Sequence, residues 1–327
     1  MNQPKRHHFV PKAYLKSFCD QKGRILVYRK DAPHKPLHVV PDATQFRRYY
    51  YSQPTPIGGQ DNTTLEALFS TVENDWPQTV ELLHQRENVN DRLEHIFNFM
   101  ALQRVRVPAS RDISEAALAQ TIKDSLKVMV ATGAISPPPT EIQDIQNQIE
   151  VSVDPHQSIH AMATMIKEVG TLLDMIGLAA VHNATARPFL TSDNPILWFD
   201  PTLHFVDQQP YNVNPNGGPV MFFFPVSPKL ALFGCNTYKE TFACHGLLHS
   251  DVPDMKWVDL LNAQVCRFAY EAVIAQSPGH EEMIAQYAGI SPVHEATTIP
   301  MRAGVATIHQ QVFGARKAKP KWSDKEY

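Results

Sequence analysis

Hydrophobic residues recur at intervals of three or four through the middle of the chain, and this spacing predicts a block of helices from about residue 62 to residue 180. Thr63 and Glu66 have the spacing of a capping box at its start. Pro77 is expected to kink or split the first helix, because proline lacks the backbone N–H. Further helices are expected from Asp91 to the residue before Pro108, over residues 112–131, from Thr140 onward, and from Asp154–Pro155 to about residue 176.

Runs of β-branched and aromatic residues flank this block and predict short strands. Two strands precede the block, over residues 24–30 and 37–40. The later strands are expected over residues 188–191, 196–199, 220–224, 230–233 and 272–275, with a helix over residues 253–270. The pattern therefore predicts an α+β fold, in which the helical block packs against a mixed or antiparallel sheet built from N-terminal and C-terminal strands.

The same pattern suggests how the chain divides into domains. Residues 1–278 are expected to form a single α+β domain, with block 62–180 either integral to it or inserted between two β parts. Residues 279–327 are expected to be a loop-rich C-terminal extension that ends in a basic tail.

Charge is distributed unevenly along the chain, although the net charge is only −3. Residues 1–50 contain eleven Lys and Arg against three Asp, a balance of +8, so the remaining residues carry −11. Such a basic front either meets an anionic partner, such as nucleic acid, or docks on the acidic remainder of the same chain.

Composition bounds the class of protein further. A hydrophobic content of 43% and a charged content of 19% are typical of globular proteins. The four cysteines form no CxxC pair, which favours reduced thiols. The chain opens without an apolar leader, and no apolar stretch is long enough to span a bilayer, so we expect a cytoplasmic protein without membrane contact.

The opening segment holds the first candidates for chemistry. His7 and His8 can ligate a metal or transfer a proton near neutral pH. The string His-His-x-x-Pro is similar to the first motif of HNH endonucleases, but the Asn and His that should follow are missing. The alternative is structural: the two histidines bond the backbone, while Tyr14 and Phe18 anchor the segment in the core.

Acidic residues supply the second set of candidates. Asp193 and Asn194 follow an apolar strand, where a carboxylate can sit at a cleft edge, but both residues also form ordinary turns. Glu66 and Glu73 are seven residues apart and share a helix face, which is either solvated or functional. With His8 and Asp193 they would make an oxygen-rich site for Mg²⁺ or Mn²⁺.

Gln103, Arg104 and Arg106 end the helix that precedes Pro108. Arginine there can bind phosphate through its planar fork, or it can favour the negative end of the helix dipole. The spacing of cysteine and histidine over residues 235–249 matches no common zinc site, and the chain has no P-loop, GxGxxG, GxSxG or HExxH motif.

Several strings together resemble one family. They are HHFVPKAYLKSF, RILVYRK, LEALFSTVE, ALQRVRVP, RPFLTSDNP and FFFPVSP. From about residue 7 to residue 277 the chain is similar to a bacterial family known only as domain of unknown function 4238. The resemblance implies a single domain and no particular activity. It also implies motif positions at His7, His8, Pro11, Tyr14, Glu66, Glu73, Gln103, Arg106, Asp193, Asn194 and Asn262, which either assemble one site or support the structure.

The leading hypothesis is a metal-dependent nuclease or phosphodiesterase of a bacterial defence or toxin type. The catalytic candidates are His7, His8, Asp193 and Asn194; the metal candidates are His8, Glu66, Glu73 and Asp193; the phosphate-binding candidates are Lys5, Arg6, Lys12, Gln103, Arg104 and Arg106. One alternative is a non-catalytic nucleic-acid or protein binding module that uses the basic front and the tyrosines at 49–51. Another is a hydrolase or transferase that acts on a small anionic ligand.

Overall fold

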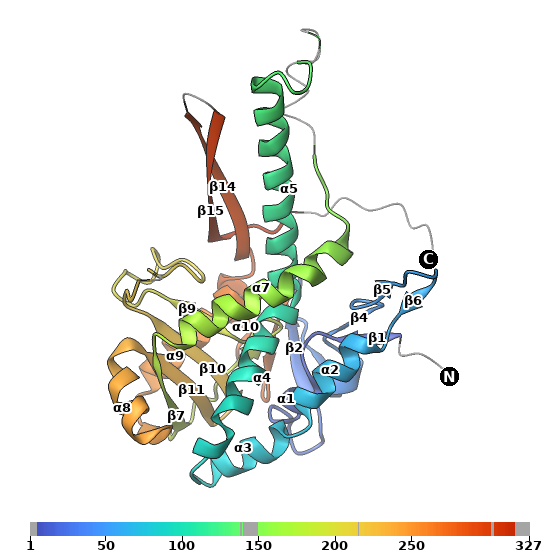
Figure 1. The fold of residues 1–327 in the computed structure, drawn as a ribbon. Coiled ribbons are helices and arrows are strands. Elements are labelled where there is room, and N and C mark those ends of the chain that lie inside the picture. The colour runs from blue at the N-terminus through green and yellow to red at the C-terminus, as the bar shows by residue number, and fades with distance from the viewer. Residues whose placement is uncertain (1–4, 138, 140–149, 215, 302–303, 318–327) are drawn as a thin grey trace.

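The computed structural model describes residues 5–137, 139, 150–214, 216–301 and 304–317. Its main body contains two sheets and a block of helices, as Figure 1 shows. The predicted α+β class is confirmed. A helix with the length and the apolar surface that a bilayer crossing demands does not occur in the described part of the chain.

The first sheet has five strands in the order β12-β7-β11-β10-β9. They are β7 (Gly177–Asn183), β9 (Leu197–Phe199), β10 (Met221–Ser227), β11 (Leu230–Cys235) and β12 (Leu248–Val252). Strand β12 pairs with β7 in parallel and the other pairs are antiparallel, so the sheet is mixed. Strands β7 and β12 were not expected, whereas β9, β10 and β11 lie where the sequence predicts strands.

The second sheet has four strands in the order β3-β2-β13-β8 and joins the two ends of the chain. Its strands are β2 (Ile25–Arg29), β3 (Leu37–Val39), β8 (Thr191–Ser192) and β13 (Ala272–Ala275). Antiparallel pairing of β2 with β13 places residue 27 beside residue 274. The predicted combination of N-terminal and C-terminal strands in one sheet is therefore confirmed.

The helical block contains α2 (Thr64–Glu73), α3 (Trp76–His84), α4 (Leu93–Arg106), α5 (Pro108–Ala131) and α7 (Pro155–Leu173). Pro77 lies in the first turn of α3 and separates it from α2, as expected. The predicted capping box at Thr63 is wrong. The Thr63 side chain does not cap α2, and Asp61 Oδ1 instead accepts the N–H groups of Thr63 and Thr64. Asp154 caps α7 as predicted, and the helix expected from Thr140 lies outside the described residues.

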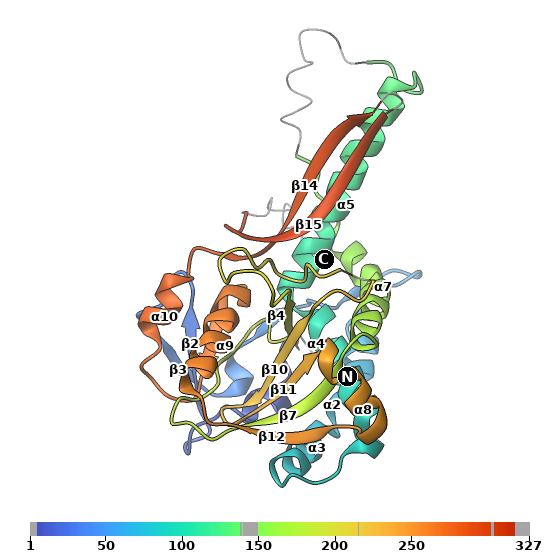
Figure 2. The ribbon, with the colours of Figure 1, turned by 90° about the vertical axis from the view of Figure 1, so that its left-hand side faces the viewer.

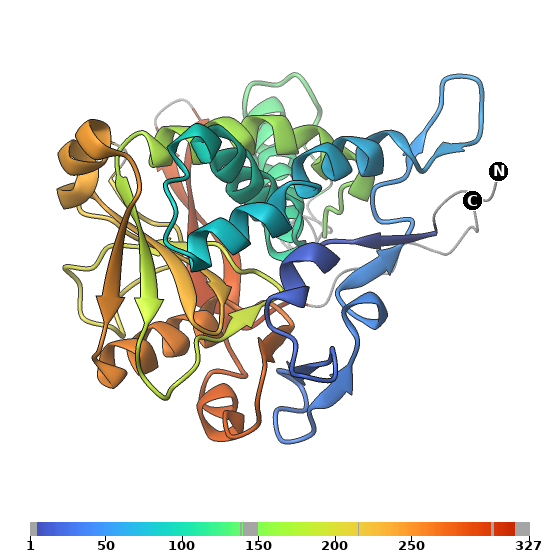
Figure 3. The same cartoon turned by 90° about the horizontal axis from the view of Figure 1, so that it is seen from below.

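The core lies on both faces of the sheets. Phe222 and Phe224 of β10 pack towards the helical block, whereas Phe223 packs towards α9 (Met255–Phe268). This alternation follows from the period of two along a strand. Figure 3 shows the two helical layers on opposite sides of the five-stranded sheet.

The segment after residue 279 is not loop-rich where the structure describes it. It forms α10 (Glu281–Gln286) and a long antiparallel hairpin of β14 (Ser291–Met301) and β15 (Gly304–Gly314). Figures 1 and 2 show this hairpin beside α5, and both project from the body. Thr307 Oγ1 donates to Asp124 Oδ2 of α5 at 2.6 Å.

Shorter elements complete the N-terminal part. They are β1 (Arg6–His8), α1 (Lys12–Lys16), β4 (Phe46–Arg48), β5 (Gln53–Pro54) and β6 (Gln60–Asp61). A further helix, α8 (Lys239–His245), precedes β12.

Candidate functional site

The opening motif is held by a two-stranded ribbon in which β1 pairs antiparallel with β4. His7 is fully buried, its Nδ1 accepts the Tyr51 N–H at 2.9 Å, and its ring stacks on the Tyr51 ring at 5.7 Å. These contacts agree with the structural interpretation of His7, in which the histidine bonds the backbone. His8 faces the other side of the ribbon, where its ring lies 5.4 Å from the Phe46 ring.

Arg106 gathers several of the predicted site residues around the end of α4. Its buried guanidinium forms an ion pair with Glu73 and donates to the backbone oxygen of His8. It also lies 4.6 Å from the centre of the Phe69 ring. Glu66 lies close enough for Arg106 to act on its pKa. Gln103 lies one turn before Arg106 on α4 and donates to the backbone oxygen of Phe9, the residue after His8. We call His8, Glu66, Glu73, Gln103 and Arg106 the Arg106 cluster.

Burial controls the ionisation of this cluster. It lowers the pKa of His8, and the nearby cation Lys12 acts in the same direction. Both effects favour the neutral form of the His8 imidazole. Burial raises the pKa of Glu66, although Arg106 opposes that shift. Among the described residues, His8 Nε2, Glu66 Oε1 and Gln103 Oε1 are buried without a hydrogen-bond partner. A buried polar atom without a partner costs free energy unless a ligand or a water bonds it, and several other side chains of the described residues have such atoms as well.

Asp193 lies in a different environment, against residues 269–271, which connect α9 to β13. Its two carboxylate oxygens accept the N–H groups of Tyr270 at 2.7 Å, Glu271 at 2.5 Å and Ala272 at 3.2 Å. Burial raises its pKa, and the neighbouring Glu271 adds to that shift. Asn194 supports the same connection, because its Nδ2 donates to the backbone oxygen of Phe268 at 2.8 Å.

The candidate metal ligands therefore bond different parts of the chain. Glu73 bonds Arg106, whereas Asp193 bonds the backbone of residues 270–272. Across the residues that the structure describes, no group of three or more His, Cys, Asp or Glu side chains is placed to hold a metal ion.

The predicted phosphate-binding residues are dispersed. Lys5 and Arg6 are exposed, and Lys12 pairs with Asp42 at 3.0 Å. Arg104 is buried, with its guanidinium 3.7 Å from the centre of the Tyr211 ring, and it lines a small cavity beside α7. Gln103 Nε2 donates to the Phe9 backbone oxygen at 3.3 Å.

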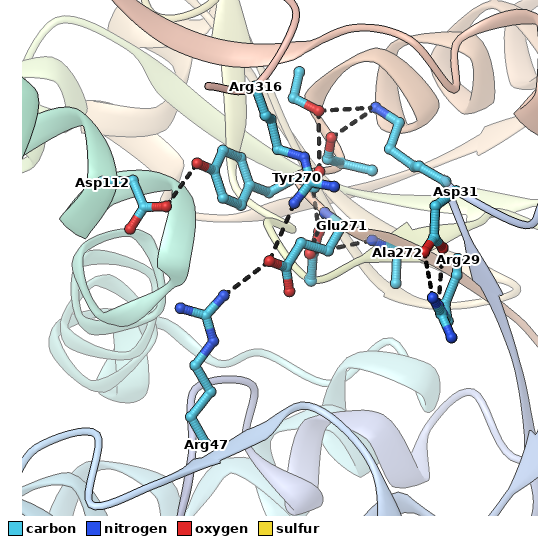
Figure 4. Close-up of polar contacts among 12 residues, drawn as sticks. Arg29, Asp31, Arg47, Asp112, Tyr270, Glu271, Ala272 and Arg316 are labelled. Atoms are coloured by element: carbon cyan, nitrogen blue, oxygen red, sulfur yellow. Dashed lines mark hydrogen bonds and ion pairs between the residues drawn. The ribbon is translucent and has the colours of Figure 1, made fainter. Parts of the chain in front are cut away.

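A cavity of about 390 Å³ lies between the β1–β4 ribbon and the second sheet, and it contains arginines that the sequence did not single out. Arg47 Nη2 and Arg316 Nη1 both bond Glu271 Oε1, at 2.8 Å and 3.1 Å. Figure 4 shows the two guanidinium groups reaching this carboxylate from different parts of the chain. We call the cavity the arginine pocket; its lining is Phe9, Val27, Arg29, Asp31, Leu37, Thr44, Gln45, Phe46, Arg47, Asp193, Glu271, Ala272 and Arg316.

Aromatic rings hold these arginines in place. The Arg47 guanidinium lies 5.3 Å from the centre of the Tyr50 ring, and that of Arg316 lies 5.2 Å from the Tyr270 ring. Arg29 is paired with Asp31 at the same pocket. The only sequence signals for these residues were the excess of cations in residues 1–50 and the basic tail, which includes Arg316.

Comparison with known proteins agrees with the expected resemblance. No curated protein and no solved structure matches the chain. A family model described as protein of unknown function (DUF4238) matches residues 6–279, which include both the Arg106 cluster and most of the arginine pocket. The chain therefore belongs to the DUF4238 family.

Proposed function

We propose that this protein binds a small phosphate-bearing ligand in the arginine pocket. The observation that carries the proposal is the sharing of one carboxylate oxygen, Glu271 Oε1, by Arg47 and Arg316. Over the whole lining three arginines are matched by three acidic residues, but the Asp193 oxygens already accept backbone N–H groups and Asp31 pairs with Arg29. At Glu271, therefore, two guanidinium groups face one carboxylate. These groups leave N–H donors available, since each guanidinium carries five.

The physical setting favours an anion at this position. The side chains of Arg47 and Arg316 are about one-third exposed, at 34% and 35%, so a ligand can reach them from solvent. Their aromatic neighbours restrict the guanidinium groups before any ligand arrives, which reduces the entropy lost on binding. Paired arginine forks suit the oxygens of a phosphate better than a lysine does.

Isothermal titration calorimetry with inorganic phosphate and a set of phosphate monoesters tests the proposal. The variant Arg47→Gln should weaken binding by about tenfold or more, because it removes a charge-assisted hydrogen bond. Affinity of the wild type should also fall as salt is added, since the pocket is open to solvent.

Arg48→Gln is the matched control, because it removes the same charge from the next residue of β4, which is exposed and outside the pocket lining. It should bind like the wild type. Equal losses in Arg47→Gln and Arg48→Gln would mean that general surface charge, not the pocket, attracts the anion. Absence of binding by the wild type would refute the proposal.

A second candidate function is a phosphodiesterase or nuclease at the Arg106 cluster that depends on Mg²⁺ or Mn²⁺. It is supported by the buried and unpartnered atoms His8 Nε2 and Glu66 Oε1. Magnesium keeps several waters and is often held by only one or two carboxylates together with substrate phosphate. This candidate thus does not require three protein ligands.

The test is cleavage of bis(p-nitrophenyl) phosphate and of single-stranded DNA with each metal added. Cleavage that is lost in Glu66→Gln and kept in Glu87→Gln, an exposed glutamate elsewhere, would support the candidate. Metal-independent cleavage, or equal rates in both variants, would exclude it.

A further inference from the structure

Gln45 is a buried polar residue in the lining of the arginine pocket. The residue is 7% exposed, and its Oε1 is buried without a hydrogen-bond partner in the described part of the chain. Its Nε2 donates to Thr44 Oγ1 at 3.1 Å, so the amide is fixed at one end only. An unpaired buried carbonyl costs free energy unless a ligand supplies a donor.

The backbone at Gln45 is strained as well. Its φ of 56° lies in the left-handed region, which residues other than glycine seldom adopt. The conformation is held by the ribbon, because the Gln45 backbone oxygen accepts the Phe9 N–H at 3.0 Å. Strained residues of this kind cluster at ligand-binding positions.

The remaining lining supplies an apolar surface beside this amide. Leu37 and the buried Val27 come from the second sheet, and Phe46, the first residue of β4, is next to Gln45 in the chain. Leu37 is 49% exposed, so apolar surface is open to a ligand at the pocket mouth. One pocket thus combines arginines, a hydrogen-bond acceptor and apolar side chains.

We propose that the ligand is a nucleoside monophosphate, whose phosphate binds Arg47 and Arg316 and whose base donates an N–H to Gln45 Oε1. This inference rests on the proposed function and names the class of phosphate ester. The size agrees: about 390 Å³ is within the range of small-molecule pockets and suits one nucleotide, not a polymer. The base would cover Leu37, and its donor would satisfy the unpaired carbonyl once the Gln45 amide, whose Oε1 is buried, turns into the pocket.

Calorimetric titration of the full chain with AMP, CMP, GMP, UMP, ribose 5-phosphate and inorganic phosphate tests the inference. At least one nucleotide should bind about fivefold or more tightly than ribose 5-phosphate, which is the effect of one hydrogen bond together with apolar burial. In Gln45→Met, which keeps the side-chain length but removes the amide, that preference should disappear while ribose 5-phosphate still binds. Gln78→Met, at an exposed position of α3, should leave all affinities unchanged.

The outcomes separate the two proposals. If ribose 5-phosphate binds as tightly as every nucleotide, the pocket recognises phosphate alone and the nucleotide inference is refuted. If Gln45→Met keeps the preference, Gln45 does not read the base. If no phosphate compound binds the wild type, both proposals fail. The comparison of nucleotides with ribose 5-phosphate uses the wild type only, so it holds even where Gln45→Met does not fold.

Discussion

Asp193 and Lys30 both hold the backbone of residues 269–272. Asp193 bonds its N–H groups, and Lys30 bonds one of its carbonyl oxygens. The Asp193 carboxylate accepts three consecutive N–H groups of this segment. The Lys30 ammonium donates to the backbone oxygen of Ala269 at 2.8 Å. Because Glu271 lies within the segment, this pair fixes the carboxylate on which the arginine pocket is built.

Asp193→Asn should therefore destabilise the protein strongly. An amide offers a single acceptor oxygen and turns an NH₂ group towards backbone donors, and it leaves the buried Lys30 without its nearby negative charge. We expect a loss of about 3 kcal/mol in the free energy of unfolding, measured by urea denaturation. Asp174→Asn, at an exposed residue after α7, is the control and should change stability by less than about 0.5 kcal/mol. A wild-type midpoint in Asp193→Asn would show that the three backbone bonds contribute little.

Arg106→Lys should also be costly, although it keeps the charge. Lysine lacks the planar fork that lets Arg106 bond Glu73 and the His8 backbone together while it covers the Phe69 ring. A loss of about 3 kcal/mol is expected from chemical denaturation, since the bonds lie in a buried setting. Arg48→Lys, on the exposed side of β4, should be neutral. Comparable stability of the two variants would contradict the view that Arg106 organises the cluster.

Tyr14→Phe tests the structural part of the opening motif. The Tyr14 hydroxyl lies 2.5 Å from Thr191 Oγ1 and donates to the backbone oxygen of Pro225 at 2.6 Å. Removal of the hydroxyl leaves two buried groups with one partner fewer, which should cost about 1–3 kcal/mol. Thermal unfolding followed by circular dichroism measures the change. The double variant with Thr191→Val should recover part of the loss, whereas simple additivity would indicate that the two hydroxyls are not coupled.

His182 should make the protein sensitive to mild acid. Burial lowers its pKa to about 4, Arg86 and His249 add to the shift, and Asp251 opposes it. Unfolded histidine has a pKa near 6.5, so between pH 6.5 and about 4 the unfolded chain takes up a proton that the native chain does not. The free energy of unfolding should fall as the pH falls through this window.

Urea denaturation at pH 7, 6 and 5 checks this expectation. His182→Gln should show a smaller decrease in stability over this range than the wild type, whereas His160→Gln, at an exposed position of α7, should follow the wild type. Parallel curves for all three proteins would assign the acid sensitivity to other groups.

Much of the fold could be predicted from local pattern, and the exceptions have physical causes. The proline at the start of α7 and the aromatic run of β10 are local signals, and both elements form where expected. Strand β7 was missed because its residues, Gly177–Asn183, are buried on both faces and do not alternate. The hairpin was missed because its strands are polar and β14 contains Pro292 and Pro300, which argue against a strand.

The candidate sites were less accessible from sequence. The residues of the Arg106 cluster could be named one at a time, but their convergence depends on how α2, α4 and β1 pack. The bond between Glu271 and Arg316 spans 45 residues and has no local signal. The strained backbone of Gln45 is set by the ribbon, and glutamine gives no indication of a left-handed conformation.

The pairing of β2 with β13 has a consequence for how the protein is made. Residues 25–29 pair with residues 272–275 in the middle of the second sheet. The sheet is therefore incomplete until most of the chain has left the ribosome. Until then an apolar strand remains without its neighbour on one edge, and such edges favour association between chains. Strand β2 is thus synthesised long before the strand that completes its sheet, so association between incomplete chains is expected at this junction.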